Sequence, residues 1–257
     1  MRNAPQAIEA IEQLFLPAEC LLCHALLADR DTDRVVCPVC RHRWRPVRPP
    51  WCERCGQPEP HFGPCRLCAE WPAALTVVRS AVWLSDGARE AVHALKYGGL
   101  PRIAEDLADA MVGLLPAPDS QSPPLLVPIP LAPKRLRQRG YNQSEALARA
   151  VSRLWKMPVG DVLIRSRETA TQTALTPETR LANVAGAFHV RGAGCGVRSD
   201  PRLAHPALRT PHSALVLVDD VFTTGATLLE AALALEQAGA RTIYGVTFGR
   251  AVIPDFT

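Results

Sequence analysis

A stretch of fourteen residues at positions 214–227, ALVLVDDVFTTGAT, constrains the fold more than any other part of the sequence. Its first five residues, 214–218, are apolar, too few for a buried helix but well suited to a central parallel strand covered on both faces. The apolar run stops at Asp219 and Asp220. We therefore expect both carboxylates at the carboxyl end of a strand, the edge at which open α/β sheets bind ligands.

The residues that follow the acidic pair predict a phosphate-binding turn. A helical pattern with apolar residues on one side begins near position 226, so the turn lies at a helix N-terminus, which carries about half a positive charge. Hydroxyl side chains and free backbone N–H groups would add donors there. The alternative is an ordinary strand-to-helix turn with Asp and Thr as caps. The residues of the turn are Thr223, Thr224, Gly225, Ala226 and Thr227.

Eight of the nine cysteines form four CxxC pairs, and their spacing predicts metal binding. Two such pairs complete the four ligands of a tetrahedral, closed Zn²⁺ site, so we expect two structural zinc ions and no chemistry at either. The alternatives are redox-active pairs or unrelated thiols. The first set is Cys20, Cys23, Cys37 and Cys40, and the second is Cys52, Cys55, Cys65 and Cys68. We interpret Cys195 as a loop thiol, and His24, His42 and His61 as surface residues.

Composition describes a globular protein of one large or two modest domains. The chain has 257 residues, of which 47% are apolar and 21% charged, and no run of 18 apolar residues occurs. The amino terminus has the spacing of an amphipathic helix and lacks a signal-peptide core, so we expect a cytoplasmic protein without membrane insertion. We place the domain boundary between residues 1–71, a helix and double zinc ribbon, and residues 72–257, an α/β domain.

Two basic stretches stand out although the net charge is only +4. Residues 41–48 carry four arginines around Trp44, which suits either single-stranded nucleic acid or a solvated linker with Trp44 packed between the ribbons. Residues 131–143, expected to form a loop, carry four more cations that would repel one another unless solvated or matched by a polyanion. These are Lys134, Arg135, Arg137 and Arg139.

The remaining sequence alternates strand and helix patterns, as in a parallel α/β sheet. We expect strands at 75–84, 125–130 and 242–248, and helices at 86–97, capped by Asp86, at 102–115 and from Asn142 to Trp155. Lys96 stands in the last turn of the first of these helices. The polar segment 163–188 suits a loop or hairpin over an active site, and 191–212 suits a surface insertion.

The strand, acidic pair and TTGAT turn resemble the ribose-5-phosphate signature of type I phosphoribosyltransferases. With the zinc ribbons, the chain resembles over nearly its whole length the ComF family, which joins a double zinc ribbon to a phosphoribosyltransferase-like domain. Further residues carry the likeness, although Tyr141 stands where the family usually has Phe, and 191–212 is longer than usual. They are VPIP at 127–130, Arg135, Arg137, RGYNQ at 139–143, Arg165, Arg167, Thr169, Gln172, Leu175, Arg180, Asn183 and Phe188.

The resemblance implies a site for phosphoribosyl pyrophosphate with Mg²⁺. Asp219 and Asp220 would hold the ribose hydroxyls, residues 223–227 the 5′-phosphate, and four cations the pyrophosphate or nucleic acid. Family members are associated with natural competence, so single-stranded DNA and the uptake machinery are expected partners. The alternatives are a true phosphoribosyltransferase, whose acceptor no motif identifies, and a regulator that senses phosphoribosyl pyrophosphate. The four cations are Lys96, Arg135, Arg137 and Arg139.

Overall fold

The computed structural model describes residues 18–27, 34–58, 64–118, 124–166, 186–191 and 214–251. The expected amino-terminal helix, His61, Cys195 and almost all of the expected insertion at 191–212 lie outside these ranges. Within the described residues, no helix is long and apolar enough to cross a membrane.

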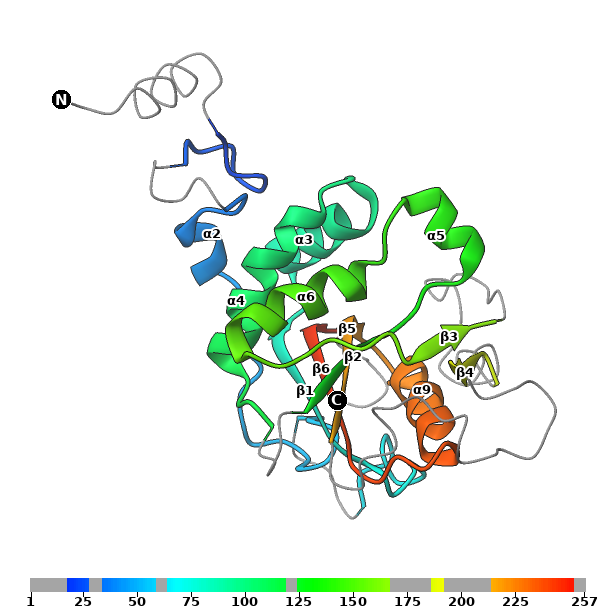
Figure 1. Ribbon diagram of the computed structural model, residues 1–257. Coiled ribbons are helices and arrows are strands. Elements are labelled where there is room, and N and C mark those ends of the chain that lie inside the picture. Colours follow the sequence, from blue (N-terminus) through cyan, green and yellow to red (C-terminus); the bar gives the residue numbers. More distant parts are fainter. Residues whose placement is uncertain are drawn as a thin grey trace.

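A parallel sheet forms the centre of the described structure, which confirms the α/β prediction (Figure 1). The strand order is β1-β6-β5-β2, so the apolar strand that precedes the acidic pair is flanked on both sides. Neighbouring strands pair in parallel throughout this sheet. The strands are β1 (Leu75–Trp83), β2 (Leu125–Pro128), β5 (Leu215–Phe222) and β6 (Ile243–Arg250).

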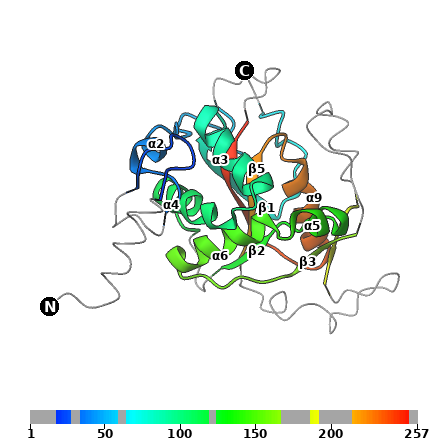
Figure 2. The ribbon, with the colours of Figure 1, turned by 90° about the horizontal axis from the view of Figure 1, so that it is seen from above.

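Helices cover both faces of the sheet, as the apolar run in β5 requires (Figures 1 and 2). Alternate side chains of β5 enter two different cores: Val216 and Val218 pack with one group of helices, and Leu215 and Leu217 pack with a single helix on the other face. The first group is α3 (Asp86–Tyr97), α4 (Ala104–Leu114) and α6 (Gln143–Trp155), and the single helix is α9 (Ala226–Gln237).

The helix predictions hold in position but differ at their ends. Ser85, not Asp86, occupies the N-cap position of α3. The helix expected at 102–115 is a 3₁₀ turn, η2 (Pro101–Ile103), followed by α4. Asn142 caps α6 as expected, because its side chain accepts a hydrogen bond of 3.1 Å from the backbone N–H of Ser144.

One expectation near the acidic pair holds and one was wrong. Both carboxylates lie in the carboxyl-terminal half of β5, which continues past them to Phe222, because β6 pairs with it as far as Arg250. The shorter β2 stops opposite Val218, so the carboxylates still lie beyond the end of one neighbour. The basic stretch 131–143 is not a loop throughout, since it contains helix α5 (Pro133–Arg139), which begins with a proline and ends at Gly140 with φ of 80°.

The segment expected as a loop or hairpin, 163–188, begins and ends in short strands. β3 (Leu163–Arg165) pairs antiparallel with β4 (Phe188–Val190). Residues 167–185 between them lie outside the described chain. The pairing brings the two ends of this segment together beside α9 (Figure 1).

The two cysteine sets lie on opposite faces of the sheet. Cys20, Cys37 and Cys40, the last on α2 (Pro38–His42), pack into the core on the side of α3 and α4. Cys55, Cys65 and Cys68 pack into the core on the side of α9. The connecting segment passes the outer edge of β1, where the Trp83 N–H donates to the Arg45 carbonyl at 2.8 Å and the Val47 N–H donates to the Ala81 carbonyl at 3.0 Å.

Trp44 in this connection is neither an exposed stacking platform nor a wedge between the ribbons, so both interpretations of it were wrong. Its side chain is buried, and its ring meets the ring of Phe248 in β6 edge-on at 5.0 Å between centroids. Packing the indole against the sheet stabilises the fold, because a buried aromatic ring removes a large apolar area from water.

The domain boundary between residues 71 and 72 stays a prediction.

Candidate functional site

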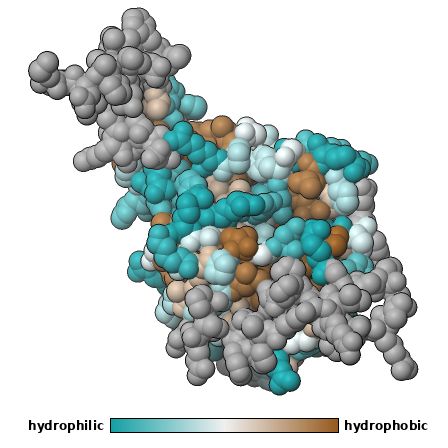
Figure 3. Space-filling model, viewed as in Figure 1, coloured by the Kyte–Doolittle hydropathy of each residue, from teal (hydrophilic) through white to brown (hydrophobic). Residues whose placement is uncertain are grey.

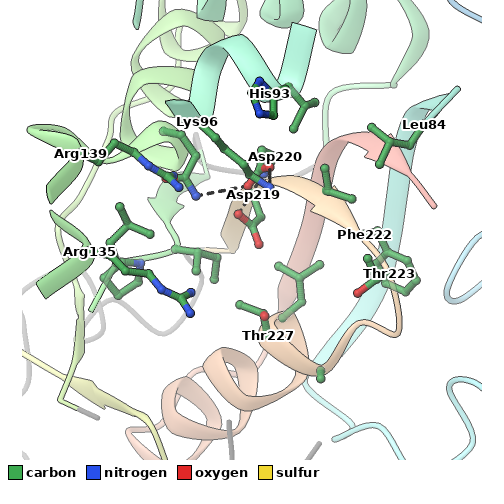
Figure 4. Close-up of a pocket in the computed structure, with 18 of the residues that line it drawn as sticks. Leu84, His93, Lys96, Arg135, Arg139, Asp219, Asp220, Phe222, Thr223 and Thr227 are labelled. Atoms are coloured by element: carbon green, nitrogen blue, oxygen red, sulfur yellow. Dashed lines mark hydrogen bonds and ion pairs between the residues drawn. The ribbon is translucent and has the colours of Figure 1, made fainter. Parts of the chain in front are cut away.

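A pocket of about 480 Å³ opens where β5 passes beyond β2 (Figure 4). Its walls come from the acidic pair, the turn before α9, the inner face of α3, the cations of α5, and the first turn of α6. Segments from residue 84 to residue 228 therefore meet at one edge of the sheet. The polar lining residues are Arg89, His93, Lys96, Tyr97, Arg135, Arg139, Gln143, Arg165, Asp219, Asp220, Thr223 and Thr227.

The two carboxylates are buried and hydrogen-bonded to different partners. Asp219 Oδ1 accepts from Ser144 Oγ at 2.8 Å and from the Asp220 backbone N–H at 2.9 Å. Asp220 Oδ1 accepts from Gln143 Nε2 at 3.2 Å, and Asp220 Oδ2 forms an ion pair with Lys96 Nζ. The first turn of α6 and the last turn of α3 therefore hold the pair from two sides.

These surroundings separate the pKa values of the two carboxyls. Burial, together with the neighbouring charge of Asp220, raises the pKa of Asp219 to about 7. Burial also acts to raise the pKa of Asp220, but the ammonium of Lys96, together with hydrogen bonds from Asp219 and Gln143, holds that pKa below its usual value. Burial acts to lower the pKa of Lys96, yet the charge of Asp220 raises it. Asp220 and Lys96 are therefore both charged at neutral pH.

The turn before α9 has the backbone that the phosphate-binding prediction needs. Gly225 has φ of 79° and occupies the N-cap position, and as a glycine it has no side chain with which to cap the helix. The first N–H groups of α9 have no acceptor within the helix, and they begin at the pocket, because Gly225, Ala226 and Thr227 line it. Thr223 also lines the pocket, whereas the hydroxyl of Thr224 is buried, with no hydrogen bond in the described structure.

The predicted cations divide into two groups. Lys96, Arg135 and Arg139 line the pocket, and the two arginines lie four residues apart on α5, so they share one face of that helix (Figure 4). Arg139 donates to Gln143 Oε1 at 2.5 Å and lies 5.1 Å from the centroid of the Tyr97 ring. Arg137 is exposed and does not line the pocket, and Lys134 is likewise exposed.

Several residues at the pocket had no assigned role in the sequence analysis. Arg89 and His93 precede Lys96 by seven and three residues, so helical spacing alone could have placed them on the same face of α3. Gln143 and Ser144 follow the predicted cap Asn142, and only the fold brings them to the carboxylates. Arg165 lines the pocket from β3, with its side chain over the ring of Phe188.

Each of the two predicted cysteine sets is gathered closely enough to hold one metal ion. The sulfur atoms of each set lie within 4.8 Å of one another, and the pairing is the one predicted from the spacing. The Sγ atoms of Cys23 and Cys37 are 3.7 Å apart, and those of Cys55 and Cys65 are 3.6 Å apart. Tetrahedral zinc with Zn–S bonds of about 2.3 Å requires about 3.8 Å between sulfurs, so both sets fit structural Zn²⁺.

Comparison with known proteins agrees with this architecture. Residues 11–69 match the double zinc ribbon domain. The DNA utilization protein YhgH of Shigella flexneri is 32% identical over 240 residues, which cover 90% of this chain and 96% of that protein. The competence protein ComFC of Bacillus subtilis is 26% identical over 86% of this chain and 89% of its own. This chain belongs to the ComF family.

A further ComF relative matches only part of the molecule. Competence protein F of Haemophilus influenzae is 33% identical over 122 residues, which cover 47% of this ComF-family chain and 48% of that protein. The names of these relatives refer to competence and DNA utilization. A competence-related family role therefore accompanies the zinc ribbons and the parallel sheet.

Proposed function

We propose that this ComF-family protein binds phosphoribosyl pyrophosphate with Mg²⁺ and acts in the handling of DNA taken up as single strands. One observation carries the proposal: an acidic pair and a helix N-terminus with glycine at its N-cap open into one pocket that is rimmed by cations. Such a pocket suits a ligand with hydroxyls in the middle and phosphates at both ends. The names of the relatives support the DNA role.

The parts of the ligand match three parts of the pocket. Carboxylates accept hydrogen bonds, so Asp219 and Asp220 would bind the ribose hydroxyls. Residues 223–227 would donate to the 5′-phosphate from the start of α9. Lys96, Arg135 and Arg139 would then meet the diphosphate. Carboxylate oxygens beside an open pocket also suit Mg²⁺, which when bound would neutralise part of the diphosphate charge.

The ion pair between Lys96 and Asp220 gives this pocket a resting arrangement. Without ligand, the ammonium neutralises a buried carboxylate, which would be costly to leave alone. A diphosphate carries more negative charge than one carboxylate and would compete for Lys96. Asp220, ionised at neutral pH because of its lowered pKa, would then accept from a ribose hydroxyl.

Titration calorimetry with Mg²⁺ and phosphoribosyl pyrophosphate tests the central proposal. Replacing Asp219 and Asp220 by Asn should weaken binding by about 100-fold or more, because the variant loses two hydrogen bonds to charged groups, which contribute about 1.5–3 kcal/mol each. Glu145→Gln is the matched control, since Glu145 is an exposed carboxylate paired with Arg149 on α6. No heat with the wild-type protein, or equal affinity in the Asn double variant, would refute the proposal.

The outward face of α5 favours a second role, contact with the backbone of single-stranded DNA. Lys134 and Arg137 are exposed there, while Arg135 and Arg139 point into the pocket from the same helix. Four cations on one short helix exceed what a single diphosphate engages. The division lets the pocket and the strand be bound at the same time.

Two double variants of α5 separate these roles. Lys134→Gln/Arg137→Gln should leave phosphoribosyl pyrophosphate affinity unchanged and flatten the slope of log DNA affinity against log salt by about 1.4, or about 0.7 for each phosphate contact. Arg135→Gln/Arg139→Gln should instead weaken phosphoribosyl pyrophosphate binding and leave the slope for DNA unchanged. Filter binding of a labelled single strand across a salt series measures the slope. An unchanged slope in Lys134→Gln/Arg137→Gln would show that the outward face of α5 does not contact DNA.

The two alternative functions use the same pocket and are separable by product. A phosphoribosyltransferase would release pyrophosphate from phosphoribosyl pyrophosphate in the presence of its acceptor. A sensing regulator would release none, but its DNA affinity would change when the ligand is added. Pyrophosphate assays beside the filter-binding experiment distinguish them.

A further inference from the structure

Arg250, the last residue of β6, is buried more deeply than an arginine can be without compensation. Its side chain is 1% exposed. A buried guanidinium must be paired or hydrogen-bonded, because its desolvation is costly. The guanidinium donates hydrogen bonds to the second zinc ribbon: to the Cys55 carbonyl at 2.9 Å and to Gln57 Oε1 at 2.8 Å. The guanidinium therefore lies against the backbone that presents a zinc ligand.

Four thiolates around one Zn²⁺ leave a net charge of about −2 at this site. A buried cation beside it is the natural counter-ion, and its charge then stabilises the loaded ribbon. Arg250 is attached to the sheet, not to the ribbon, so this attraction also fixes how the ribbon sits on the carboxyl end of β6.

The other side of the same guanidinium contacts the ligand pocket. Its central carbon lies 4.4 Å from the centroid of the Phe222 ring. Phe222 ends β5 opposite Arg250 in the strand register, and it lines the pocket. Arg250 therefore has the zinc ribbon on one side and a pocket residue on the other.

Phe222 in turn supports the phosphate-binding turn. A methyl group added at Gly225 would lie 2.9 Å from two atoms of the Phe222 ring and 3.2 Å from the ring of Trp71. Contacts this close leave the turn no room to settle toward the rings. The position of Gly225, and of the N–H groups that follow it, therefore depends on where the two rings lie.

The second ring is also held by the ribbon. Arg54, between Cys52 and Cys55, donates to the carbonyls of Cys68 and Trp71, each at 3.0 Å. Trp71 packs against Phe222 with ring centroids 6.3 Å apart. Two separate contact routes, one through Arg250 and one through Arg54, thus run from the second cysteine set to the turn.

We infer that the second zinc ribbon sets the geometry of the phosphate-binding turn through Arg250, so that Zn²⁺ at Cys52, Cys55, Cys65 and Cys68 raises the affinity of the pocket for a phosphorylated ligand. Arg250 is a positioning residue in this arrangement. Because coupling is reciprocal, the ligand must raise the affinity of this site for zinc by the same factor. The ligand part of this inference rests on the proposed function; the effect of the ribbon on the turn does not.

The test compares Arg250→Met with Arg79→Met. Arg79 contacts the same ribbon, through the Glu53 carbonyl at 2.7 Å, but stacks on Trp51 and not on Phe222. Hydrogen exchange of the zinc-loaded proteins, measured by mass spectrometry, gives the protection of the backbone N–H groups at residues 223–229 in the absence of ligand. Arg250→Met should exchange there about tenfold faster than wild type, whereas Arg79→Met should match wild type. Protection of α6 checks that each variant remains folded.

Calorimetry with Mg²⁺ and phosphoribosyl pyrophosphate completes the test. Arg250→Met should retain two zinc ions and bind the ligand about tenfold more weakly, and added ligand should no longer raise its zinc affinity in equilibrium competition with a chelator. Wild-type protection of the turn in folded Arg250→Met would overturn the inference whatever the ligand does. Failure of the wild-type protein to bind ligand, with the exchange difference present, would instead refute the proposed function and leave the ribbon-to-turn coupling standing.

Discussion

Asp219 and Asp220 are neighbours in the chain but stand in different electrostatic surroundings. Asp220 has Lys96 as a counter-ion, whereas Asp219 has the hydroxyl of Ser144 and the charge of Asp220 beside it. Near neutral pH the pair therefore carries a single negative charge more readily than two, as expected for closely spaced carboxylates. A ligand that brings hydroxyls and a cation to the pocket relieves this repulsion.

This difference predicts a pH-dependent stability. The pKa of Asp219 is raised from 3.8 to about 7 in the folded protein, so its contribution to stability is complete below about pH 4 and is lost as pH rises through about 7. Asp219→Asn stays neutral throughout. It should therefore be more stable than wild type above pH 7, by about 4 kcal/mol, with the advantage vanishing near pH 4.

Urea unfolding at several pH values measures that difference. Asp161→Asn is the control, because Asp161 is exposed and its ion pair with Arg191 lies at the surface. Its difference from wild type should stay small at each pH. A wild-type protein that is more stable than Asp219→Asn at pH 8 would contradict the prediction.

The glycine of the phosphate-binding turn gives a second prediction at this scale. Gly225→Ala combines a positive φ with a clash against Phe222 and Trp71, so it should cost about 3 kcal/mol and abolish phosphate binding. Gly239→Ala is matched, since Gly239 has φ of 99° but no atom within 4 Å of the added methyl, and it should cost only about 1 kcal/mol. Equal losses of unfolding free energy in Gly225→Ala and Gly239→Ala would show that the rings of Phe222 and Trp71 move to make room for the added methyl group.

At the scale of elements, the ends of helices and strands form the pocket. They are the last turn of α3, the first turns of α6 and α9, and the carboxyl end of β5. Helix ends carry backbone groups without intrahelical partners, so each end offers polar contacts where a mid-helix surface would not. Tyr141 connects two of these ends. Its hydroxyl donates to the carbonyl of Leu95, in the turn of α3 that carries Lys96.

Tyr141→Phe should therefore loosen the last turn of α3. Burial raises the pKa of Tyr141, so the hydroxyl is protonated and donates at neutral pH. Its loss should cost about 1 kcal/mol of unfolding free energy, as for a typical hydrogen bond. Tyr244→Phe, in β6, is the control and should be nearly neutral. Chemical denaturation measures the free energy of unfolding of each variant. Equal stability of Tyr141→Phe and wild type would show that the hydroxyl does not stabilise the fold.

At the scale of the molecule, the two ribbons lie on opposite sides of the sheet, the first against α4 and the second beside α9. The coloured part of the face in Figure 3 shows hydrophilic side chains with several separate apolar areas among them, and the two cores lie between the sheet and its two covers. Ion pairs hold the first ribbon to α4: Arg34 meets Asp109 at 2.6 Å, and Arg41 meets it at 3.2 Å. The second ribbon shares a core with α9.

Removal of zinc should consequently destabilise the sheet and not only the ribbons. Metal analysis should return about two Zn²⁺ per chain. Cys55→Ser, at a buried site in the core beside α9, should lower the melting temperature much more than Cys23→Ser, at an exposed site. Thermal unfolding followed by circular dichroism, with zinc content measured in parallel, tests this. Equal shifts in the two variants would mean that the second ribbon does not stabilise the sheet.

The sequence by itself determined those features whose signals are local. Two CxxC pairs within about twenty residues suffice to define a four-cysteine site, and the pairing it predicts is the one observed. An apolar run followed by two aspartates, small hydroxyl residues and a helical pattern likewise defined β5, the turn and α9. The cap at Asn142 and the buried faces of the helices followed from spacing within one or two turns.

Only the tertiary structure decided which distant residues meet. It placed Gln143 and Ser144 on the aspartates, turned Arg137 away from the pocket, buried Trp44 against Phe248, and joined Arg250 to the second ribbon. It also put the ribbons on opposite faces of the sheet. These outcomes depend on the order of parallel strands and on which partners satisfy buried charge, and neither is encoded in any short stretch, because the groups that meet are separated by up to 195 residues.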